Sequence, residues 1–524
     1  MTWLIVLGGI VAALALVAVH DLMQRKHAIL RNFPILGHLR YMLEKVGPEL
    51  RQYIVTSNDE ERPFSRNQRR WVYSSAKRMN NQFGFGSDND VDKPDYLIIK
   101  PNWRAHTPPP GGDRDDYPLP CAKVVGAARG RAKAFRPTSV VNVSGMSFGA
   151  LSGSAVEAMN RGAALADCLH NTGEGGLSRY HQAGGEIVFQ IGTAYFGCRD
   201  ADGRFSLPRL VELAEANPVR AIEIKLSQGA KPGLGGFLPA GKVTPEIAAA
   251  RGVPVGRDCA SPGSHSAFHT IDELLDFVEG IADATGLPVG VKSAVGDTDF
   301  WRELARLMAT TGRGVDFVTI DGGEGGTGAA PLVFADHVAL PYRHAMSRVY
   351  REFAYQGLTS DVTFIGSGKL GFPESALLAF ALGADMINVG REAMLAVGCI
   401  QAQRCHTGHC PAGVATQSQW LQRGVDPASK AVRLANYVTV LRRELTTLSR
   451  SCGEPHPAFV TLEHFEFMNG PSATPATERF DYRQGWSLPS AADQLALRKA
   501  MRACGRLPEE DALALAAATL DPGQ

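Results

Sequence analysis

The run Val140-Val-Asn-Val143-Ser144-Gly145-Met146-Ser147-Phe148-Gly149-Ala150-Leu151-Ser152 joins a short β-branched segment to a polar, glycine-containing turn. The residues that follow, Ser152–Leu165, are typical of a helix. A strand, a polar turn and a helix in that order make one βα unit. A series of such units predicts an α/β fold with a parallel sheet.

The same unit recurs along the chain. Strands are predicted at Val140–Val143, Leu169–Asn171, Ile187–Ile191, Ala221–Lys225, Val289–Lys292, Phe317–Ile320, Val362–Ile365 and Met386–Val389. Helices are predicted around Ser152–Leu165, Pro208–Ala216, Ile271–Ala284, Asp299–Thr310, Pro373–Leu382 and Glu392–Val397. Eight strands in about 250 residues have the dimensions of a closed (β/α)8, TIM-type barrel. An open doubly wound sheet is the alternative, although it does not require eight units.

Polar and glycine residues follow the predicted strands. In a barrel these carboxyl ends form one face, and active sites lie there. The candidate residues on this face are Ser144, Gly145, Met146, Ser147, Glu174, Gln190, Lys225, Gln228, Lys231, Lys292, Gly325, Gly326, Gly366, Ser367, Gly368, Gly390 and Arg391.

Two of these turns match G-x-G-x-x-G, at Gly323/Gly325/Gly328 and at Gly366/Gly368/Gly371. Such a match can indicate a dinucleotide site, but only between a strand and an immediately following helix. The first copy leads into Pro331–Tyr342, which reads as irregular. The second has a strand before it and a helix after it, and a flavin phosphate held by the last two strand ends explains it equally well. We favour FMN over NAD, with a plain tight turn as the remaining alternative.

Three lysines fall on or near these strands, and burial disfavours a charged lysine unless a counter-charge is close. One interpretation is structural, with salt bridges to acidic residues of the same face. The other is functional, with Lys292 beside the flavin N1–C2=O edge, where a fixed cation stabilises the reduced flavin. We favour function for Lys225, Lys231 and Lys292, and the structural counter-charges would be Glu174, Glu223 and Asp321.

A second chemical signal is the cysteine run Gly398–Gln417. Cys399, Cys405 and Cys410 have the spacing C-x5-C-x4-C, and Pro411 follows at once. Three thiolates on one loop suit an iron–sulfur cluster. A zinc site completed by His406 or His409 is the first alternative, and unligated cysteines are the second.

The chain has 524 residues, nine cysteines and a net charge of +1. The charge gives no reason to expect nucleic acid as a partner, and the irregular, odd set of cysteines does not indicate a disulfide framework.

The segment Trp3–Val19 contains seventeen residues without a charge, near the lower limit for a membrane span. A cleaved signal peptide is the alternative. Arg25, Lys26 and Arg31 follow the segment and no basic residue precedes it, which favours a single-pass anchor with the following chain in the cytoplasm.

The expected organisation has four parts. Residues 1–21 form the transmembrane anchor, and residues 22–112 form a helical and irregular region with short helices near Arg31–His38 and Gly47–Tyr53. Residues 113–417 form the barrel with its cysteine loop. Residues 418–524 form a helical extension, in which Val432–Ser449 is the clearest helix.

Five runs, in consistent order from Ser144 to Gln417, resemble the synthase domain of glutamate synthase. They are S-G-M-S-F-G-A-L-S, N-T-G-E-G-G, I-K-x-x-Q-G-A-K-P-G-x-G-G, G-G-T-G-A-A-P-L and C-P-A-G-V-A-T-Q. The resemblance implies a β/α barrel with FMN, and a [3Fe–4S] cluster on Cys399, Cys405 and Cys410. It also implies reductive amination of 2-oxoglutarate to L-glutamate, in which reduced flavin passes hydride to 2-iminoglutarate formed with ammonia. In that reaction Lys231 and Arg251 would hold the carboxylates of the 2-oxo acid.

The chain also departs from this family. It shows neither the amino-terminal glutaminase domain nor the carboxyl-terminal β-helix, so we expect ammonia to come from outside. The expected cluster and the lack of an NAD(P) domain indicate an external electron donor, a ferredoxin or an NAD(P)H-oxidising flavoprotein. Phe237 stands where the family has a glutamine that contacts the oxo acid, a loss of roughly 1–3 kcal/mol for that substrate. The alternatives are therefore an FMN-barrel oxidoreductase for another 2-oxo, 2-hydroxy or amino acid, such as an N-methylglutamate synthase-like enzyme, or a membrane redox relay.

Overall fold

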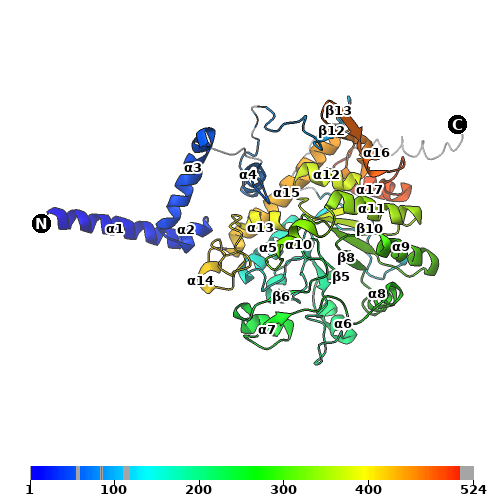
Figure 1. Ribbon diagram of the computed structural model, residues 1–524, viewed down its shortest axis with the longest axis horizontal. Helices are drawn as coiled ribbons and strands as arrows, with labels where there is room; N and C mark the ends of the chain where they lie inside the picture. The colour runs from blue at the N-terminus through cyan, green and yellow to red at the C-terminus, as the bar shows by residue number, and fades with distance from the viewer. Residues whose placement is uncertain (1, 55–59, 83, 85, 110–117, 508–524) are drawn as a thin grey trace.

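Eight parallel strands close into a barrel in the computed structural model, which describes residues 2–54, 60–82, 84, 86–109 and 118–507 (Figure 1). The order around the barrel is β10-β11-β2-β3-β4-β5-β8-β9, and β11 pairs with β2 to close it. The strands are β2 (Val141–Val143), β3 (His170–Asn171), β4 (Ile187–Ile191), β5 (Val219–Lys225), β8 (Val289–Ser293), β9 (Phe317–Asp321), β10 (Thr363–Ser367) and β11 (Met386–Val389). The predicted closed barrel is confirmed, and the open sheet is wrong.

Helices surround the strands and follow the predicted βα order. They are α5 (Gly153–Ala166), α6 (Leu207–Ala216), α8 (Ile271–Thr285), α9 (Asp299–Thr311), α11 (Tyr342–Tyr355), α12 (Pro373–Ala381) and α13 (Arg391–Val397). Side-chain caps fix several starts: Ser152 accepts from the Ala155 amide, and Thr270 and Glu273 form a capping box at α8.

The stretch Pro331–Tyr342, predicted to be irregular, contains the short helix α10 (Leu332–His337), and α11 begins at its end. This prediction was wrong, and Pro331 and Pro341 do not interrupt a helix. Each proline instead precedes the first residue of a helix, a position where its missing amide costs nothing.

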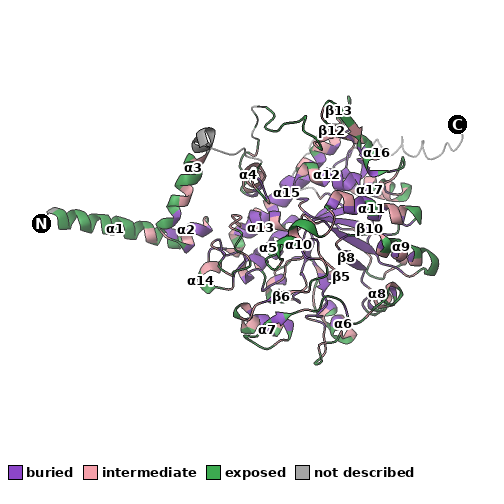
Figure 2. Ribbon diagram, viewed as in Figure 1, coloured by how far each residue is buried: buried purple, intermediate pink, exposed green. Residues whose placement is uncertain are grey.

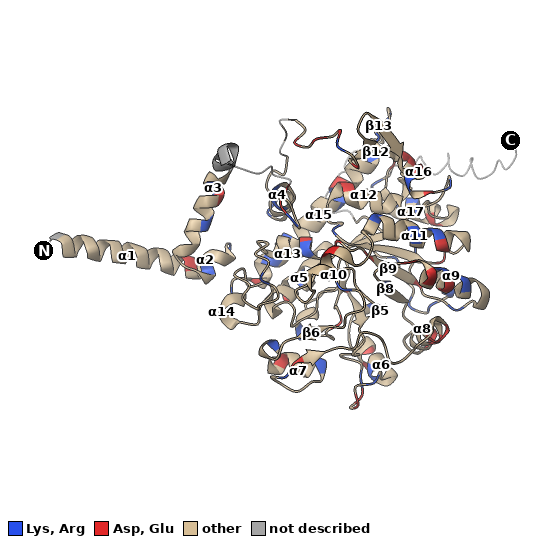
Figure 3. Cartoon of the chain, viewed as in Figure 1, with Lys and Arg blue, Asp and Glu red and all other residues tan. Residues whose placement is uncertain are grey.

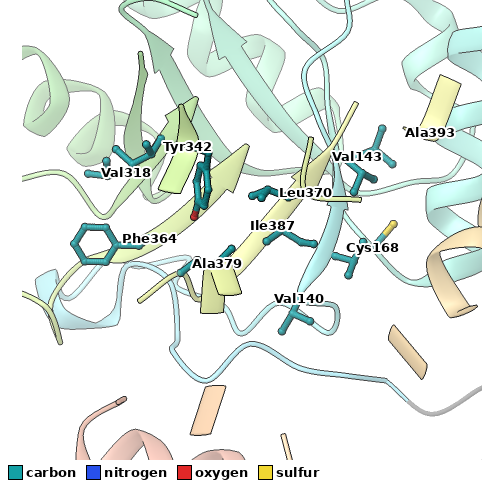
Figure 4. Close-up of a cluster of buried hydrophobic side chains, with 14 of the residues drawn as sticks. Val140, Val143, Cys168, Val318, Tyr342, Phe364, Leu370, Ala379, Ile387 and Ala393 are labelled. Atoms are coloured by element: carbon teal, nitrogen blue, oxygen red, sulfur yellow. The ribbon is translucent and has the colours of Figure 1, made fainter. Parts of the chain in front are cut away.

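The core lies between the strands and the surrounding helices. Figure 4 shows Val318, Ile387 and Phe364 among the buried side chains of this layer, and Figure 2 shows the barrel strands largely buried. Strands covered on both faces lose the alternation of polar and apolar residues, so their short apolar runs could be read directly from the sequence.

An insertion after β5 covers part of the carboxyl face. It contains α7 (Pro245–Arg251) and a small antiparallel pair, β6 (Phe237–Leu238) with β7 (Cys259–Ala260). The insertion places Phe237 and Arg251 above the strand ends.

The amino-terminal region consists of α1 (Thr2–Met23), α2 (Ala28–Asn32), α3 (Leu36–Ile54) and α4 (Arg66–Ala76). The short helices predicted near Arg31–His38 and Gly47–Tyr53 are wrong in their bounds, since α2 ends within the first range and the second is part of the continuous helix α3. Pro48 has no amide hydrogen, so it cannot donate to the carbonyl of Glu44 four residues earlier. Glu44 is an exposed residue, and water can therefore hydrogen-bond its carbonyl instead.

Within the described part of the chain, α1 is the one helix long and apolar enough to cross a membrane. None of its apolar window is buried against the protein, and it extends away from the barrel (Figures 1 and 2).

The carboxyl-terminal part contains α14 (Gln419–Gln422), α15 (Pro427–Ser451), α16 (Ala476–Phe480) and α17 (Ala491–Ala503), with α15 packed along α5. It is not helical throughout, because β12 (Phe465–Asn469) and β13 (Ser472–Pro475) form a hairpin there. The hairpin is joined by β1 (Leu97–Ile99), with Leu97 opposite Phe467. The regions before and after the barrel thus share one antiparallel sheet, and pairing over such a distance leaves no signal in short windows of sequence.

Candidate active site

The loops after the first three barrel strands meet at the carboxyl face. A Cβ atom on Gly145 would come within 2.8 Å of Asn171 Oδ1 and 3.1 Å of Gln190 Nε2. A Cβ atom on Gly173 would lie 2.7 Å from the Ser147 nitrogen. These contacts leave no room for side chains at the two glycines. The structure therefore brings the predicted segment Ser144–Ser147 together with Gln190 and the loop that carries Glu174.

Glu174 and Lys225 form a buried ion pair on this face. The Lys225 Nζ lies 2.8 Å from Glu174 Oε1 and donates to Gln228 Oε1 at 2.6 Å. Burial alone raises the pKa of Glu174, but the positive charges of Lys225, Lys231 and Arg251 together hold that pKa below its usual value. Glu174 therefore stays ionised near neutral pH, and the predicted catalytic residues form one electrostatic unit.

Lys231 and Arg251 are buried cations without a carboxylate in hydrogen-bond contact among the described residues. Lys231 is 3% exposed and donates to the Gly235 carbonyl at 2.7 Å. Its pKa is lowered by burial, and the charge of Glu174 opposes that effect only partly. Arg251 is 7% exposed and donates to the Phe148 carbonyl at 3.3 Å, while its Nε has no hydrogen-bond partner. Two cations with spare donors suit a dianionic substrate.

Lys292 stands beside Lys225 on the neighbouring strand, and its Nζ lies 3.6 Å from Asp321 Oδ2. Burial lowers the pKa of Lys292, but Asp321 and Glu223 outweigh this and hold it above its usual value. The salt-bridge interpretation is thus confirmed for Lys225 and Lys292. Neither bridge removes the positive charge from the strand ends, so the flavin-facing role of Lys292 stays a prediction.

Glu223 was named from the sequence only as a counter-charge. In the structure its carboxylate accepts from Asn171 Nδ2 at 2.8 Å, Gln190 Nε2 at 2.6 Å and Thr319 Oγ1 at 2.6 Å. It therefore orients side chains of three other strands inside the barrel. A glutamate in the middle of an apolar strand was the signal that could have identified this role.

The glycines after β9, β10 and β11 create a narrow cradle. A Cβ atom on Gly366 would lie 2.5 Å from the Tyr342 hydroxyl, and one on Gly326 would lie 2.8 Å from Arg391 Cδ. Gly368 has φ +131° and lies against Gly322, so no other residue fits there without strain. Ser367 is the last residue of β10, beside this turn. Gly390 precedes α13, and a Cβ atom on it would lie 3.6 Å from Ser144 Cβ.

Two cations line this cradle. The Arg391 guanidinium donates to the Glu324 carbonyl, and Lys369 lies between Gly368 and Leu370 with φ 58°. Burial and the charge of Arg391 lower the pKa of Lys369. An anion between these cations would relieve that repulsion, so the residues fit the phosphate of FMN. Lys369 was missed from the sequence, although it directly follows the glycine turn.

The three cysteines of the loop Gly398–Gln417 lie near one another. Cys399 and Cys405 are partly buried and Cys410 is buried; all nine cysteines of the chain are free thiols. Burial, with smaller contributions from Cys410 and Cys405, raises the pKa of Cys399 to about 12, although the hydrogen bond from the Gln401 amide opposes this shift. Over the described ranges, no group of three His, Cys, Asp or Glu side chains already has a metal-binding arrangement. A [3Fe–4S] cluster and a zinc site both stay predictions, and the donor set of three thiols is the one an iron–sulfur cluster takes.

The cysteine loop is enclosed by segments that the sequence did not connect with it. The Tyr73 hydroxyl donates to the Cys399 carbonyl at 2.8 Å, and Gln401 exchanges two hydrogen bonds with the backbone of Phe64. On the barrel side, Lys242 donates to the Cys405 carbonyl at 2.9 Å, and Gly328 packs against Cys405. The loop after β9 therefore touches both the flavin cradle, through Gly326, and the cysteine loop.

Phe237 lies at the mouth of the site. Its side chain is 52% exposed, and it pairs with Ala260 across the small β6–β7 ribbon. A Cβ atom on the preceding Gly236 would lie 3.3 Å from Glu174 Oε1. The ribbon therefore approaches the ion pair closely, and an aromatic ring stands at its edge.

Comparison with known proteins agrees with this geometry. Residues 123–454 match the family model described as a conserved region in glutamate synthase. The chain belongs to the glutamate synthase family. It is 38% identical over 482 residues to the glutamate synthase large subunit-like protein YerD of Bacillus subtilis, covering 86% of this chain and 91% of that protein.

A second relative in the glutamate synthase family is the archaeal glutamate synthase [NADPH] of Methanocaldococcus jannaschii. It is 37% identical over 317 residues, covering 60% of this chain and 59% of the relative. Among solved structures, a flavocytochrome b2 variant with sulfite bound has a TM-score of 0.44 at 12% identity, covering 85% of this chain and 90% of that chain. The family membership makes this chain an oxidoreductase of the glutamate synthase type.

Proposed function

We propose that this chain reductively aminates 2-oxoglutarate to L-glutamate, using FMN on the barrel and a [3Fe–4S] cluster on the cysteine loop. Ammonia and electrons come from outside the chain, and the electron donor is a ferredoxin or an NAD(P)H-oxidising flavoprotein. The N-terminal helix α1 attaches the enzyme to a membrane with the barrel in the cytoplasm. The proposal rests on the set of buried charges at the strand ends, which lies next to the glycine cradle. The loop after β9 connects this cradle with the cysteine loop.

The substrate is proposed to lie above Glu174 and Lys225. Lys231 and Arg251 would bind its two carboxylates, because both are buried, charged and supplied with unused donors. Lys225 is hydrogen-bonded to Gln228 and paired with Glu174, so its ammonium can give up a proton to the product nitrogen while Glu174 keeps it oriented.

Bound FMN would supply the hydride that reduces the imine formed from the 2-oxo acid and ammonia. The residues proposed to hold it are Ser144–Ser147 and Gln190 at one end and Arg391, Ser367 and the surrounding glycines at the phosphate end. Lys292 would stabilise negative charge on the reduced flavin, since it stays protonated beside Asp321.

The cysteine loop is proposed as the point where electrons enter. Cys399, Cys405 and Cys410 would hold the cluster, and Gly328 gives the loop after β9 its close approach to Cys405. This arrangement requires no nicotinamide site on the chain.

The test is turnover by the purified full-length chain under anaerobic conditions. 2-Oxoglutarate, ammonium and reduced ferredoxin should give glutamate, detected by chromatography, and Lys231→Ala should raise KM for the oxo acid by at least about tenfold. A flavin that is reduced and reoxidised without glutamate formation would contradict the proposal.

Phe237 supports a second candidate, an enzyme for a related oxo or amino acid. Its exposed ring replaces a polar partner at the mouth of the site. Faster turnover with methylamine in place of ammonia, or with a more apolar 2-oxo acid in place of 2-oxoglutarate, would favour this candidate.

A further inference from the structure

A small basic cavity lies between the amino-terminal helices and helices α13 and α15. It has a volume of about 90 Å³ and is formed by α2, α3, α4, α13 and α15 (Figure 1). A single water needs roughly 10–15 Å³ of such space, so the cavity accommodates a group of several heavy atoms. Its charged lining residues are Lys26, Arg40, Lys77, Lys430, Arg433 and Glu44.

The protein leaves most of this positive charge uncompensated. Glu44 is the single carboxylate of the lining, and it is bonded to Arg40. Lys430 is 1% exposed, and among the described residues its Nζ has one bond, to the Lys26 carbonyl at 3.3 Å. Arg433 donates to the same carbonyl at 2.8 Å. Burial, with the charges of Arg433 and Lys77, lowers the pKa of Lys430 to about 7.

A buried cation with too little counter-charge is costly for the folded protein, and Asp426, the one carboxylate that raises the pKa of Lys430, is outweighed there by burial and the neighbouring cations. An anion inside the cavity would remove the repulsion between Lys430, Lys77 and Arg433. It would also gain charge-assisted hydrogen bonds from their donors, which are stronger than neutral ones. The chemistry of the lining therefore calls for a phosphate-like group.

The position of the cavity indicates where that group comes from. The uncharged stretch of α1 ends beside α2 (Figure 3). Met23 is the last residue of α1, and Lys26 of the cavity lining follows it by three positions. The junction is fixed, because the Asp21 carboxylate accepts from the Ile35 amide at 3.0 Å and contacts His38 Nε2 at 2.9 Å. If α1 spans a membrane, the cavity lies at the level of the lipid headgroups.

We propose that this cavity binds the phosphate of an anionic phospholipid. The inference rests on the membrane attachment proposed above. Lys430, Lys77 and Arg433 donate to the phosphate oxygens, and anionic lipids of the cytoplasmic leaflet attract such clusters of basic residues. The opposite wall of the cavity is Gly398–Ile400, so a bound headgroup also supports the start of the cysteine loop.

The test uses the full-length chain in a neutral detergent, with thermal unfolding and calorimetric titration as readouts. Dihexanoyl phosphatidylglycerol should bind at least about tenfold more tightly than dihexanoyl phosphatidylcholine and should raise Tm. Lys430→Met should raise Tm in the absence of lipid, because it removes an uncompensated buried charge, and should abolish the further rise on adding phosphatidylglycerol. Lys45→Met, which removes an exposed charge of α3 outside the cavity lining, should behave as the wild type.

Three results would overturn the proposal. One is equal binding of the two lipids. Another is a Lys430→Met variant that is less stable than wild type and still responds to phosphatidylglycerol, which would make Lys430 a structural residue. The third is inorganic phosphate binding as tightly as the lipid, which would assign the cavity to a free anion. Flotation of the chain with neutral phosphatidylcholine vesicles tests the membrane attachment separately, since that result depends on α1 and not on the cavity.

Discussion

The carboxyl face of the barrel and the basic cavity at the amino-terminal helices treat charge in opposite ways. On the face, Lys225 and Lys292 each meet a carboxylate, at 2.8 Å and 3.6 Å. In the cavity, Lys430 has one carbonyl as its partner. These two lysines and their carboxylates lie at strand ends of one sheet, so the barrel itself positions them as pairs, whereas Lys231 and Arg251, after β5, have no carboxylate partner among the described residues. The cavity joins segments far apart in the chain, and its charges require a ligand for compensation.

The largest expected effect is on the face. Lys292→Met leaves Asp321 and Glu223 without their counter-charge inside the barrel. Breaking a buried pair costs about 3–5 kcal/mol, so the free energy of unfolding in denaturant should fall by that amount, and bound flavin should be lost.

The double variant Lys292→Met/Asp321→Asn separates stability from flavin binding. It removes both charges of the pair, so it should recover much of the lost stability without regaining the flavin. If Lys292→Met were as stable as the wild type, the Lys292–Asp321 pair would not stabilise the folded chain. The proposed difference between the carboxyl face and the cavity would then be wrong.

The next effect concerns turnover. Glu174→Gln removes the charge that orients Lys225, and we expect kcat to fall by about 10²-fold, the lower range for a group that assists proton transfer. The matched control is Glu246→Gln, which alters a partly exposed pair with Arg179 on α7. An unchanged kcat in the Glu174 variant would remove this pair from the mechanism.

On the amino-terminal side, Asn32 donates to the Pro411 carbonyl at 3.0 Å and to the Leu421 carbonyl at 2.8 Å. Asn32→Ala leaves both carbonyls without this donor, which should cost about 1–3 kcal/mol and should speed hydrogen exchange in the cysteine loop. Asn217→Ala, at the C-cap of α6, should leave exchange in that loop unchanged. Equal exchange in both variants would mean that the amino-terminal region does not hold the loop.

A smaller effect is expected for Tyr73→Phe, which removes only the hydroxyl that donates to the Cys399 carbonyl. One hydrogen bond contributes about 0.5–1.5 kcal/mol, so Tm should fall slightly and iron should be lost faster to a chelator. Tyr96→Phe is the control, and iron loss at the same rate in both variants would contradict the proposed support of the loop.

The smallest expected effect is a dependence of the free energy of unfolding on pH in the acidic range. The pKa of Glu174 is below its ordinary value of 4.5 in the folded chain, so the unfolded chain binds the proton first. This carboxylate therefore contributes stability above about pH 4.5 that is lost as the pH falls through its folded pKa. Denaturant unfolding between pH 5 and pH 3 should show a shallower loss for Glu174→Gln than for the wild type, and parallel curves would contradict the pKa direction.

The sequence predicted the barrel well because each strand is a short apolar run between polar turns, and this pattern is local. It also predicted which turns carry polar groups, since the carboxyl ends of parallel strands share one face. It missed the contact between Tyr73 and Cys399, which are 326 residues apart, and the pairing of β1 with β12. Such contacts depend on tertiary packing, which no window of sequence contains.

The roles within the site were predicted less completely than its location. Glu223 was expected to neutralise a lysine, yet it also orients side chains of three other strands through hydrogen bonds. The burial of Lys430 was not predicted at all, because burial is invisible in a single sequence. In both cases the partner of a charge is fixed by the fold.

The central claim is that one chain carries FMN on the barrel face and a three-iron cluster on the cysteine loop. The most direct measurement is quantification of FMN, iron and sulfide in anaerobically purified protein, with the absorbance spectrum of wild type and Cys405→Ala. The account predicts flavin in both, with about three irons per chain in the wild type alone. Zinc in place of iron, or iron retained in Cys405→Ala, would contradict it.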